Sequence, residues 1–121
     1  MAKQDFGGVW HSIYHYKHPD LPGLQKSEHD VKIYRKGDEL IIESLPNDEN
    51  SYLIVHLKLD GNIATGSWEE HTSPTGAHKR EIYSGAVQFV LSDDGNDFDG
   101  MYLTFDRRNF VKSNYWHLYR Q

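Results

Sequence analysis

Glu70 is the residue whose surroundings most directly suggest chemistry. It lies in the stretch Trp68-Glu69-Glu70-His71-Thr72, so on a β-strand its side chain shares one face with those of Trp68 and Thr72. A carboxylate on an aromatic face is costly to bury unless it is paired or wet, because desolvation raises its pKa. Two roles stay open for Glu70: it can accept hydrogen bonds from interior tyrosine hydroxyls, or from the N–H groups of an amide or nucleobase edge.

The segments that must position Glu70 alternate with a period of two and are separated by turn residues. Three of the separators are short and contain Gly37, Gly61 and Gly95, which is typical of tight hairpins. We predict eight strands, over residues 8–18, 25–36, 39–45, 51–59, 62–72, 80–91, 97–106 and 113–120.

Eight sequential antiparallel strands would leave two bare edges in a flat sheet, and closing the sheet removes both. We therefore expect an all-β fold, an eight-stranded antiparallel up-and-down β-barrel that forms one domain over residues 1–121. A two-sheet sandwich is the alternative. The odd-numbered connections are long and contain all four prolines, whereas the even-numbered ones are tight turns. One end of the barrel should be closed by the turns, and the other should be a mouth ringed by four loops.

The mouth is expected to be basic although the chain has a net charge of −5. In or beside the long loops lie Lys17, Lys26, Lys79, Arg80, Arg107, Arg108 and Lys112, against Asp20, Asp48, Glu49 and Asp106. Acidic residues gather instead at the closed end, at Asp38, Glu39, Asp60, Asp93, Asp94 and Asp97. A cationic rim would hold an anionic aromatic ligand, with Arg107, Arg108 and Lys112 as the charged contacts. The alternative is that these are ordinary solvated loop charges.

The first strand begins Gly8-Val9-Trp10, and the last ends with Arg120. This Gly-x-Trp arrangement with a terminal arginine resembles the calycin barrels, the lipocalins and avidins. The resemblance implies that Gly8, Trp10 and Arg120 form a plug at the closed end. In it, the arginine would pack on the indole in a cation–π contact worth ~0.5–2 kcal/mol.

A second resemblance involves the C-terminal third. Residues 82–91 followed by 99–120 look like the barrel receptors for cyclic nucleotides of bacterial antiphage systems. The Trp-x-Glu-x-Thr pattern of Trp68, Glu70 and Thr72 is also similar to that of uncharacterised bacterial barrel domains. The transmembrane or DNA-binding partner domains of those proteins do not occur in this sequence.

With Trp10 placed inward, alternation carries Ser12, Tyr14, Tyr16 and His18 to the interior. The same reasoning places His29, Val31 and Ile33 inward on the second strand. The sixth strand is apolar on both faces, and we take Tyr83, Gly85, Val87 and Phe89 as its inward residues. We expect the ligand to contact Tyr14, Tyr16, His18, Trp68, Glu70, Thr72, Tyr83 and Tyr102. The alternative is that these side chains simply fill the barrel.

Several functions are disfavoured. The net charge of −5 argues against binding of long nucleic acid. No apolar stretch approaches the ~18 residues of a membrane span. The absence of cysteine fits a reducing, cytoplasmic compartment. His11 and His15, four apart on a strand, are ~13 Å apart and cannot share a metal ion. Neighbouring Glu69 and Glu70 face opposite ways, so they form no acid/base pair.

On the outer wall, Met101, Leu103 and Phe105 should form an apolar stripe that Ile82, Ala86 and Val90 extend. This stripe predicts a homodimer.

The sequence thus predicts a non-catalytic barrel, without cofactor or metal, that binds a planar anionic small molecule such as a nucleotide-type second messenger. A filled barrel acting as a protein-interaction module and an enzyme with Glu70 as acid/base are the alternatives.

Overall fold

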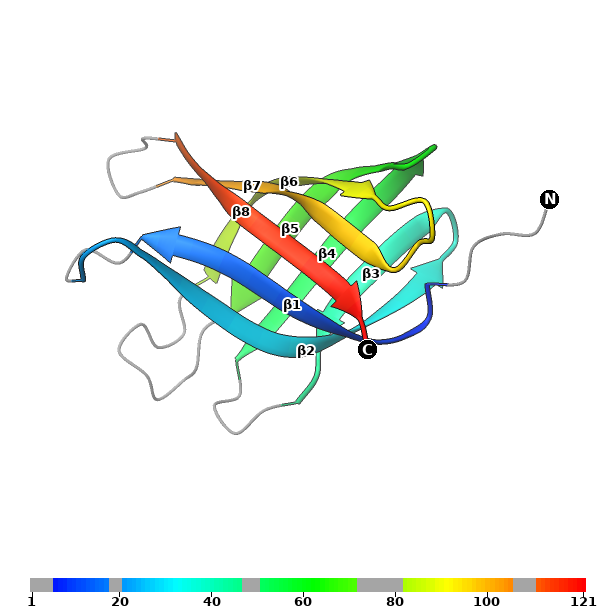
Figure 1. Ribbon diagram of the computed structural model, residues 1–121, viewed down its shortest axis with the longest axis horizontal. Coiled ribbons are helices and arrows are strands. Elements are labelled where there is room, and N and C mark those ends of the chain that lie inside the picture. The colour runs from blue at the N-terminus through cyan, green and yellow to red at the C-terminus, as the bar shows by residue number, and fades with distance from the viewer. Residues whose placement is uncertain (1–5, 18–20, 47–50, 72–81, 106–110) are drawn as a thin grey trace.

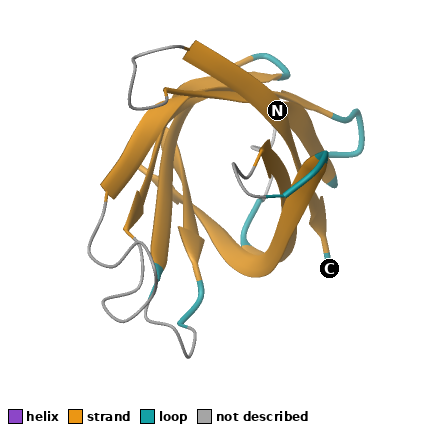
Figure 2. Ribbon diagram, turned by 90° about the vertical axis from the view of Figure 1, so that its left-hand side faces the viewer, coloured by secondary structure: helices purple, strands orange, loops and turns teal. Residues whose placement is uncertain are grey.

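A computed structural model describes residues 6–17, 21–46, 51–71, 82–105 and 111–121 and confirms the eight-stranded barrel. The strands are β1 (Gly8–Lys17), β2 (Leu24–Lys36), β3 (Glu39–Ser44), β4 (Tyr52–Asp60), β5 (Ile63–His71), β6 (Ile82–Leu91), β7 (Asp97–Phe105) and β8 (Val111–Arg120). Each pairs antiparallel with its neighbours in the chain, and β1 pairs with β8 to close the ring (Figures 1 and 2). Every strand end that falls on described residues lies within two residues of its expected place.

The three tight turns lie together at one end of the barrel (Figure 1). Gly37, Gly61 and Gly95 have φ angles of 64°, 63° and 74°, in the left-handed region that glycine adopts without strain. The turn residues therefore predicted the three hairpins correctly. The long connections leave from the opposite end, which we call the open end.

The interior of the closed half is packed with buried apolar side chains. Alternation gave the inward faces correctly, including β6, on which Val87 and Phe89 are buried. Phe98 is the centre of an aromatic group, with ring centroids 4.9 Å from Trp10, 5.6 Å from Phe6 and 5.9 Å from Phe89. This half of the barrel is filled, so any ligand has to bind nearer the open end.

The expected plug at the closed end is present. The guanidinium of Arg120 lies 4.6 Å from the centroid of the Trp10 ring and donates a 2.9 Å hydrogen bond to the Gly7 carbonyl. Gly8 has a φ of 117°, a conformation that favours glycine. The Trp10 indole N–H donates to the Phe6 carbonyl at 2.9 Å, and Phe6 is itself buried. Phe6 is a part of the plug that the sequence did not reveal.

Two inward glycines lie opposite indoles at points where neighbouring strands approach closely. Gly85 lies opposite Trp68 in the β5–β6 ladder, and Gly100 lies opposite Trp116 in the β7–β8 ladder. A Cβ at Gly85 would overlap the Leu103 carbonyl oxygen and press on the Trp68 indole nitrogen. The absence of a side chain therefore lets the neighbouring strand and the ring approach closely.

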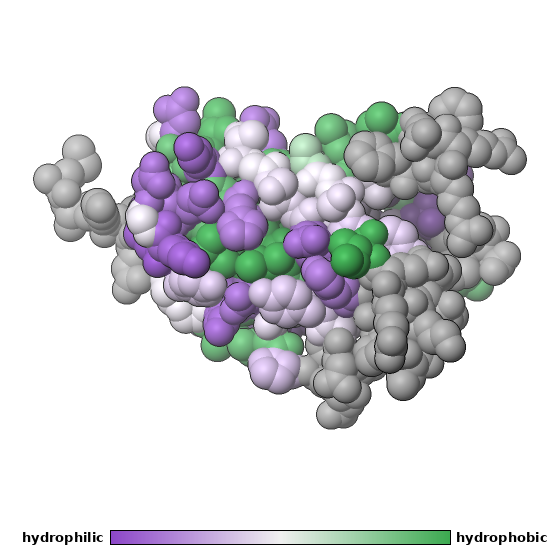
Figure 3. Space-filling view, turned by 180° about the vertical axis from the view of Figure 1, so that it is seen from behind, coloured by the Kyte–Doolittle hydropathy of each residue, from purple (hydrophilic) through white to green (hydrophobic). Residues whose placement is uncertain are grey.

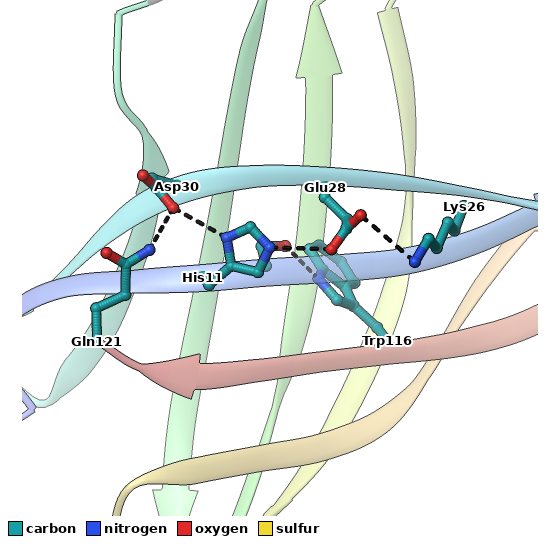
Figure 4. Close-up of polar contacts among 7 residues, drawn as sticks. His11, Lys26, Glu28, Asp30, Trp116 and Gln121 are labelled. Atoms are coloured by element: carbon teal, nitrogen blue, oxygen red, sulfur yellow. Dashed lines mark hydrogen bonds and ion pairs between the residues drawn. The ribbon is translucent and has the colours of Figure 1, made fainter.

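The outer faces of the strands differ in polarity. In the view from behind, hydrophilic side chains gather at the tight-turn end (Figure 3), where the six acidic residues named above lie in or beside the turns. On β1 and β2, His11 lies between two carboxylates, 3.0 Å from Asp30 and 3.2 Å from Glu28 (Figure 4). The hydrogen bond to Asp30 raises the pKa of His11, with Glu28 adding to the effect and burial opposing it.

Among the described residues, no helix has the length and apolar character needed to cross a membrane.

Candidate functional site

Above the apolar core, toward the open end, four strands direct polar and aromatic side chains inward. We call these residues the mouth cluster: Tyr14 on β1, His29 on β2, Trp68 and Glu70 on β5, and Tyr102 on β7. Alternation positions them, because each lies two or four residues from a buried inward residue of its own strand.

Tyr14 and Glu70 join opposite sides of the cluster. The Tyr14 hydroxyl donates a 3.3 Å hydrogen bond to Oε2 of Glu70, which connects β1 with β5. Burial raises the pKa of Glu70, and the Tyr14 hydroxyl partly offsets this rise because it stabilises the carboxylate. Burial also raises the pKa of Tyr14, so that its hydroxyl stays protonated and donates. One of the two roles expected for Glu70, partner of an interior tyrosine, is therefore present. A carboxylate has ~4 acceptor sites, which leaves capacity for a ligand.

The rings of the cluster pack edge to face around Tyr102. Its centroid lies 5.5 Å from that of Trp68 and 6.1 Å from that of Tyr14, both at interplanar angles of 87°. Trp116, below the cluster, packs on Tyr102 at 5.6 Å and donates its indole N–H to the buried Ser12 hydroxyl at 2.9 Å (Figure 4). Burial, with the Glu70 charge adding to it, raises the pKa of Tyr102 to about 12. Edge-to-face packing and hydrogen bonding together fix these rings in place.

Two main-chain ladders end at this level. The β6–β7 register ends at Val87 and Tyr102, and the β1–β8 register ends at Tyr14 and Trp116. Beyond these pairs, the open end of the β7–β8 hairpin stands away from β1 (Figure 1), and we call its described part, residues 103–105 and 111–113, the lip.

Side chains of the mouth cluster bond to the backbone where the ladders stop. The Trp68 indole N–H donates to the Leu103 carbonyl at 3.1 Å, across β6. The Tyr102 hydroxyl donates to the His15 carbonyl, across the β1–β8 boundary. Both residues are expected to contact a ligand; Trp68 also ties the lip to the barrel, and Tyr102 ties β7 to β1 next to the lip.

His29 adds a polar atom that the sequence-based site did not include. Its ring meets the Tyr14 ring edge to face at 5.8 Å, and its Nε2 atom is buried with no hydrogen-bond partner among the described residues. Burial lowers the pKa of His29, and the nearby His11 lowers it further, so the ring is neutral at pH 7. Buried polar atoms are nearly always hydrogen-bonded, and this nitrogen has capacity for a ligand atom or a water.

The remaining predicted site residues are distributed as follows. Tyr16 lies above Tyr14, with ring centroids 6.3 Å apart. Tyr83 pairs with Glu70 in the β5–β6 ladder but is 37% exposed, so it belongs to the rim. Lys112 is exposed near the start of β8. Four predicted residues lie outside the described residues: His18, Thr72, Arg107 and Arg108.

The fold and the cluster define the class of this protein as a closed eight-stranded antiparallel β-barrel with a polar aromatic layer at its open end. This is the architecture that the calycin resemblance implies. The chain matches no family model, and no curated protein is similar enough to count as a match. Within the described part of the chain, no group of three His, Asp or Glu side chains has a geometry that could hold a metal ion.

Proposed function

We propose that this barrel binds a planar small molecule at its open end and catalyses no reaction. The observation that carries the proposal is the buried Glu70 carboxyl group, bonded to Tyr14 inside a set of edge-to-face rings. Burial of a charged group lowers the stability of the folded barrel, and a loss of stability of this kind is typical of functional sites. Glu69, the neighbouring carboxylate, is 47% exposed on the outside, so the two do not act as an acid/base pair.

The chemistry of the cluster favours a ligand with a hydrogen-bonding aromatic edge. Glu70 accepts from N–H groups, and the Nε2 atom of His29 adds a second polar contact at the level of Tyr14. Tyr and Trp rings offer flat surfaces against which a heterocycle stacks. A nucleobase has both properties, and the filled lower half keeps it near the open end.

The position of charge sets the orientation of such a ligand. A carboxylate inside the cluster repels anionic groups, whereas Lys17, Lys26 and Lys112 lie on strand ends at the open end, and Arg107 and Arg108 follow in the sequence. The base would therefore enter first and the phosphate would stay at the rim. A nucleotide-type second messenger fits this arrangement, and the resemblance to bacterial cyclic-nucleotide receptor barrels supports it. A cytoplasmic location, which the cysteine-free sequence favours, is part of the proposal.

The test is ligand-dependent thermal unfolding against a panel of nucleosides, nucleotides and cyclic mono- and dinucleotides. Mass spectrometry of the small molecules that heat releases from the purified protein provides an independent search. We expect at least one nucleotide to raise the Tm, and Glu70→Gln to weaken its affinity by about tenfold or more, the equivalent of ~1.4 kcal/mol.

The matched control is Glu69→Gln, because it removes the same charge one residue away but on the outer face. It should bind like the wild type. The proposal is wrong if no compound of the panel shifts the Tm and no molecule is released, or if Glu70→Gln binds the ligand as tightly as the control does.

A further inference from the structure

The outer face of β6, β7 and β8 is nearly free of charge. The outward residues of β6 are Ile82, Ser84, Ala86, Gln88 and Val90, and those of β8 are Val111, Ser113, Tyr115, His117 and Tyr119. On β7 the outward side chains that are described are Asp97, Asp99, Met101 and Leu103. The two carboxylates among these residues both have partners on β8: the Tyr115 hydroxyl donates to Asp99, and His117 Nε2 lies 3.1 Å from Asp97.

The outer face of β2 contrasts with this face. Outward positions of β2 carry Lys26, Glu28, Asp30, Lys32 and Lys36, so charges occupy most of that strand's outer face. Surfaces of small soluble domains carry ~25–35% charged residues, and depletion of charge is typical of the core of a protein interface. The face of β6–β8 therefore has the composition of a contact surface.

Exposed apolar side chains pair with each other across two ladders of this face, β5–β6 and β7–β8. Val90 is 49% exposed and pairs with Ile63 on β5, while Met101 is 51% exposed and pairs with Tyr115 on β8. We call this surface the apolar wall, and it consists of Ile63, Ile82, Val90, Met101, Leu103, Val111, Tyr115 and Tyr119. These eight residues expose on the order of 700 Å², close to the ~800 Å² that each partner contributes to a standard interface.

We propose that the apolar wall binds the wall of a second copy of this chain in a symmetric dimer. A chain of net charge −5 repels its own copies through any charged face, whereas a face with two carboxylates in fourteen described outward positions brings few like charges together. In a dimer with a two-fold axis, the commonest symmetry of protein dimers, the same face of both copies forms the interface. An apolar face meets this requirement because it brings few like charges together. The proposal goes beyond ligand binding and does not depend on it.

The test is size-exclusion chromatography with light scattering of the full chain over a range of micromolar concentrations. We expect the wild type to have the mass of a dimer, and Val90→Glu to reduce it to that of a monomer, because a carboxylate would be buried at the interface on both copies. The matched control is Leu24→Glu, since Leu24 is 61% exposed on β2, a strand that pairs with none of the strands of the wall. The control should remain a dimer.

A second variant separates the interface from effects of net charge. Met101→Lys adds a positive charge to the wall and makes the net charge of the chain less negative, yet we expect it also to give a monomer. Thermal unfolding at low concentration, where all forms are monomeric, should show that the variants fold. A wild type that is monomeric throughout, or a dimer that survives both Val90→Glu and Met101→Lys, overturns the proposal.

Discussion

The hydrogen bond between Tyr14 and Glu70 makes a quantitative test of the mouth cluster possible. Tyr14→Phe removes the donor hydroxyl and keeps the ring that packs on Tyr102 and Trp116, with centroids 6.1 and 5.7 Å away. Glu70 then remains buried without this donor. Hydrogen bonds to charged groups contribute ~1.5–3 kcal/mol, and at 3.3 Å we expect the lower end of that range. For a domain of this size, a loss of ~1.5 kcal/mol lowers the Tm by roughly 5 °C.

The loss should depend on pH with a definite sign. Burial raises the pKa of Glu70 and the Tyr14 hydroxyl lowers it, so Tyr14→Phe should raise it further. A carboxyl group with a raised pKa in the folded state contributes stability below its unfolded pKa and loses that contribution as the pH rises through the folded value. The destabilisation by Tyr14→Phe should therefore be larger at pH 8 than at pH 5.

A double-mutant cycle with Glu70→Gln measures the pairwise energy. The free energies of unfolding of the wild type, the two single variants and the double variant are obtained by urea denaturation at pH 8 and pH 5. Because burial disfavours the carboxylate, Glu70→Gln alone should stabilise the barrel at pH 8, by an amount in the ~0.5–2 kcal/mol range of other stabilising substitutions. Effects of Tyr14→Phe and Glu70→Gln that add within ~0.5 kcal/mol at pH 8 would refute the reasoning, since independent sites add in that way.

Three further predictions concern other parts of the barrel. Trp68→Phe keeps a ring but loses the bond to the Leu103 carbonyl, so amide hydrogen exchange should accelerate in the lip and not in the tight turns; uniform acceleration would contradict this. Gly85→Ala should cost ~1–3 kcal/mol in urea denaturation because its methyl group overlaps that carbonyl, and a loss below ~0.5 kcal/mol would show that the strands yield. Asp30 and Glu28 raise the pKa of His11, so the stability it adds is present below pH 6.5 and fades at higher pH. His11→Gln should therefore destabilise the protein more at pH 5.5 than at pH 8, and equal losses would contradict the ion pairs.

The fold could be predicted from the sequence because its signals are local. Turn residues such as Gly37, Gly61 and Gly95 mark the hairpins, and alternation assigns the inward face of each strand without knowledge of the others. The Trp10–Arg120 contact was implied by the resemblance to calycin barrels, and the topology agrees with it, because eight antiparallel strands bring the start of the first and the end of the last to the same end.

The details of the mouth cluster depend on contacts between distant strands, which alternation does not report. Phe6 precedes the first strand, so no periodicity indicates that it packs under Trp10. That His29 faces inward was predictable, but the missing partner of its Nε2 atom depends on the packing of several strands. The β6–β7 and β1–β8 ladders end at Val87–Tyr102 and at Tyr14–Trp116, positions that no local pattern marks.

Leu103 connects the two surfaces for which functions are proposed. Its carbonyl accepts the hydrogen bond from the Trp68 indole in the mouth cluster, and its side chain is 42% exposed on the apolar wall. A ligand that drew the indole away from this carbonyl would loosen the lip and displace Leu103 on the outer face. If binding and dimerisation both occur, they are therefore linked. Such linkage is reciprocal: ligand changes the affinity of one copy for another by a certain factor, and dimerisation changes the affinity for ligand by the same factor. The affinity for ligand of the wild type should then depend on protein concentration, whereas that of monomeric Val90→Glu should not.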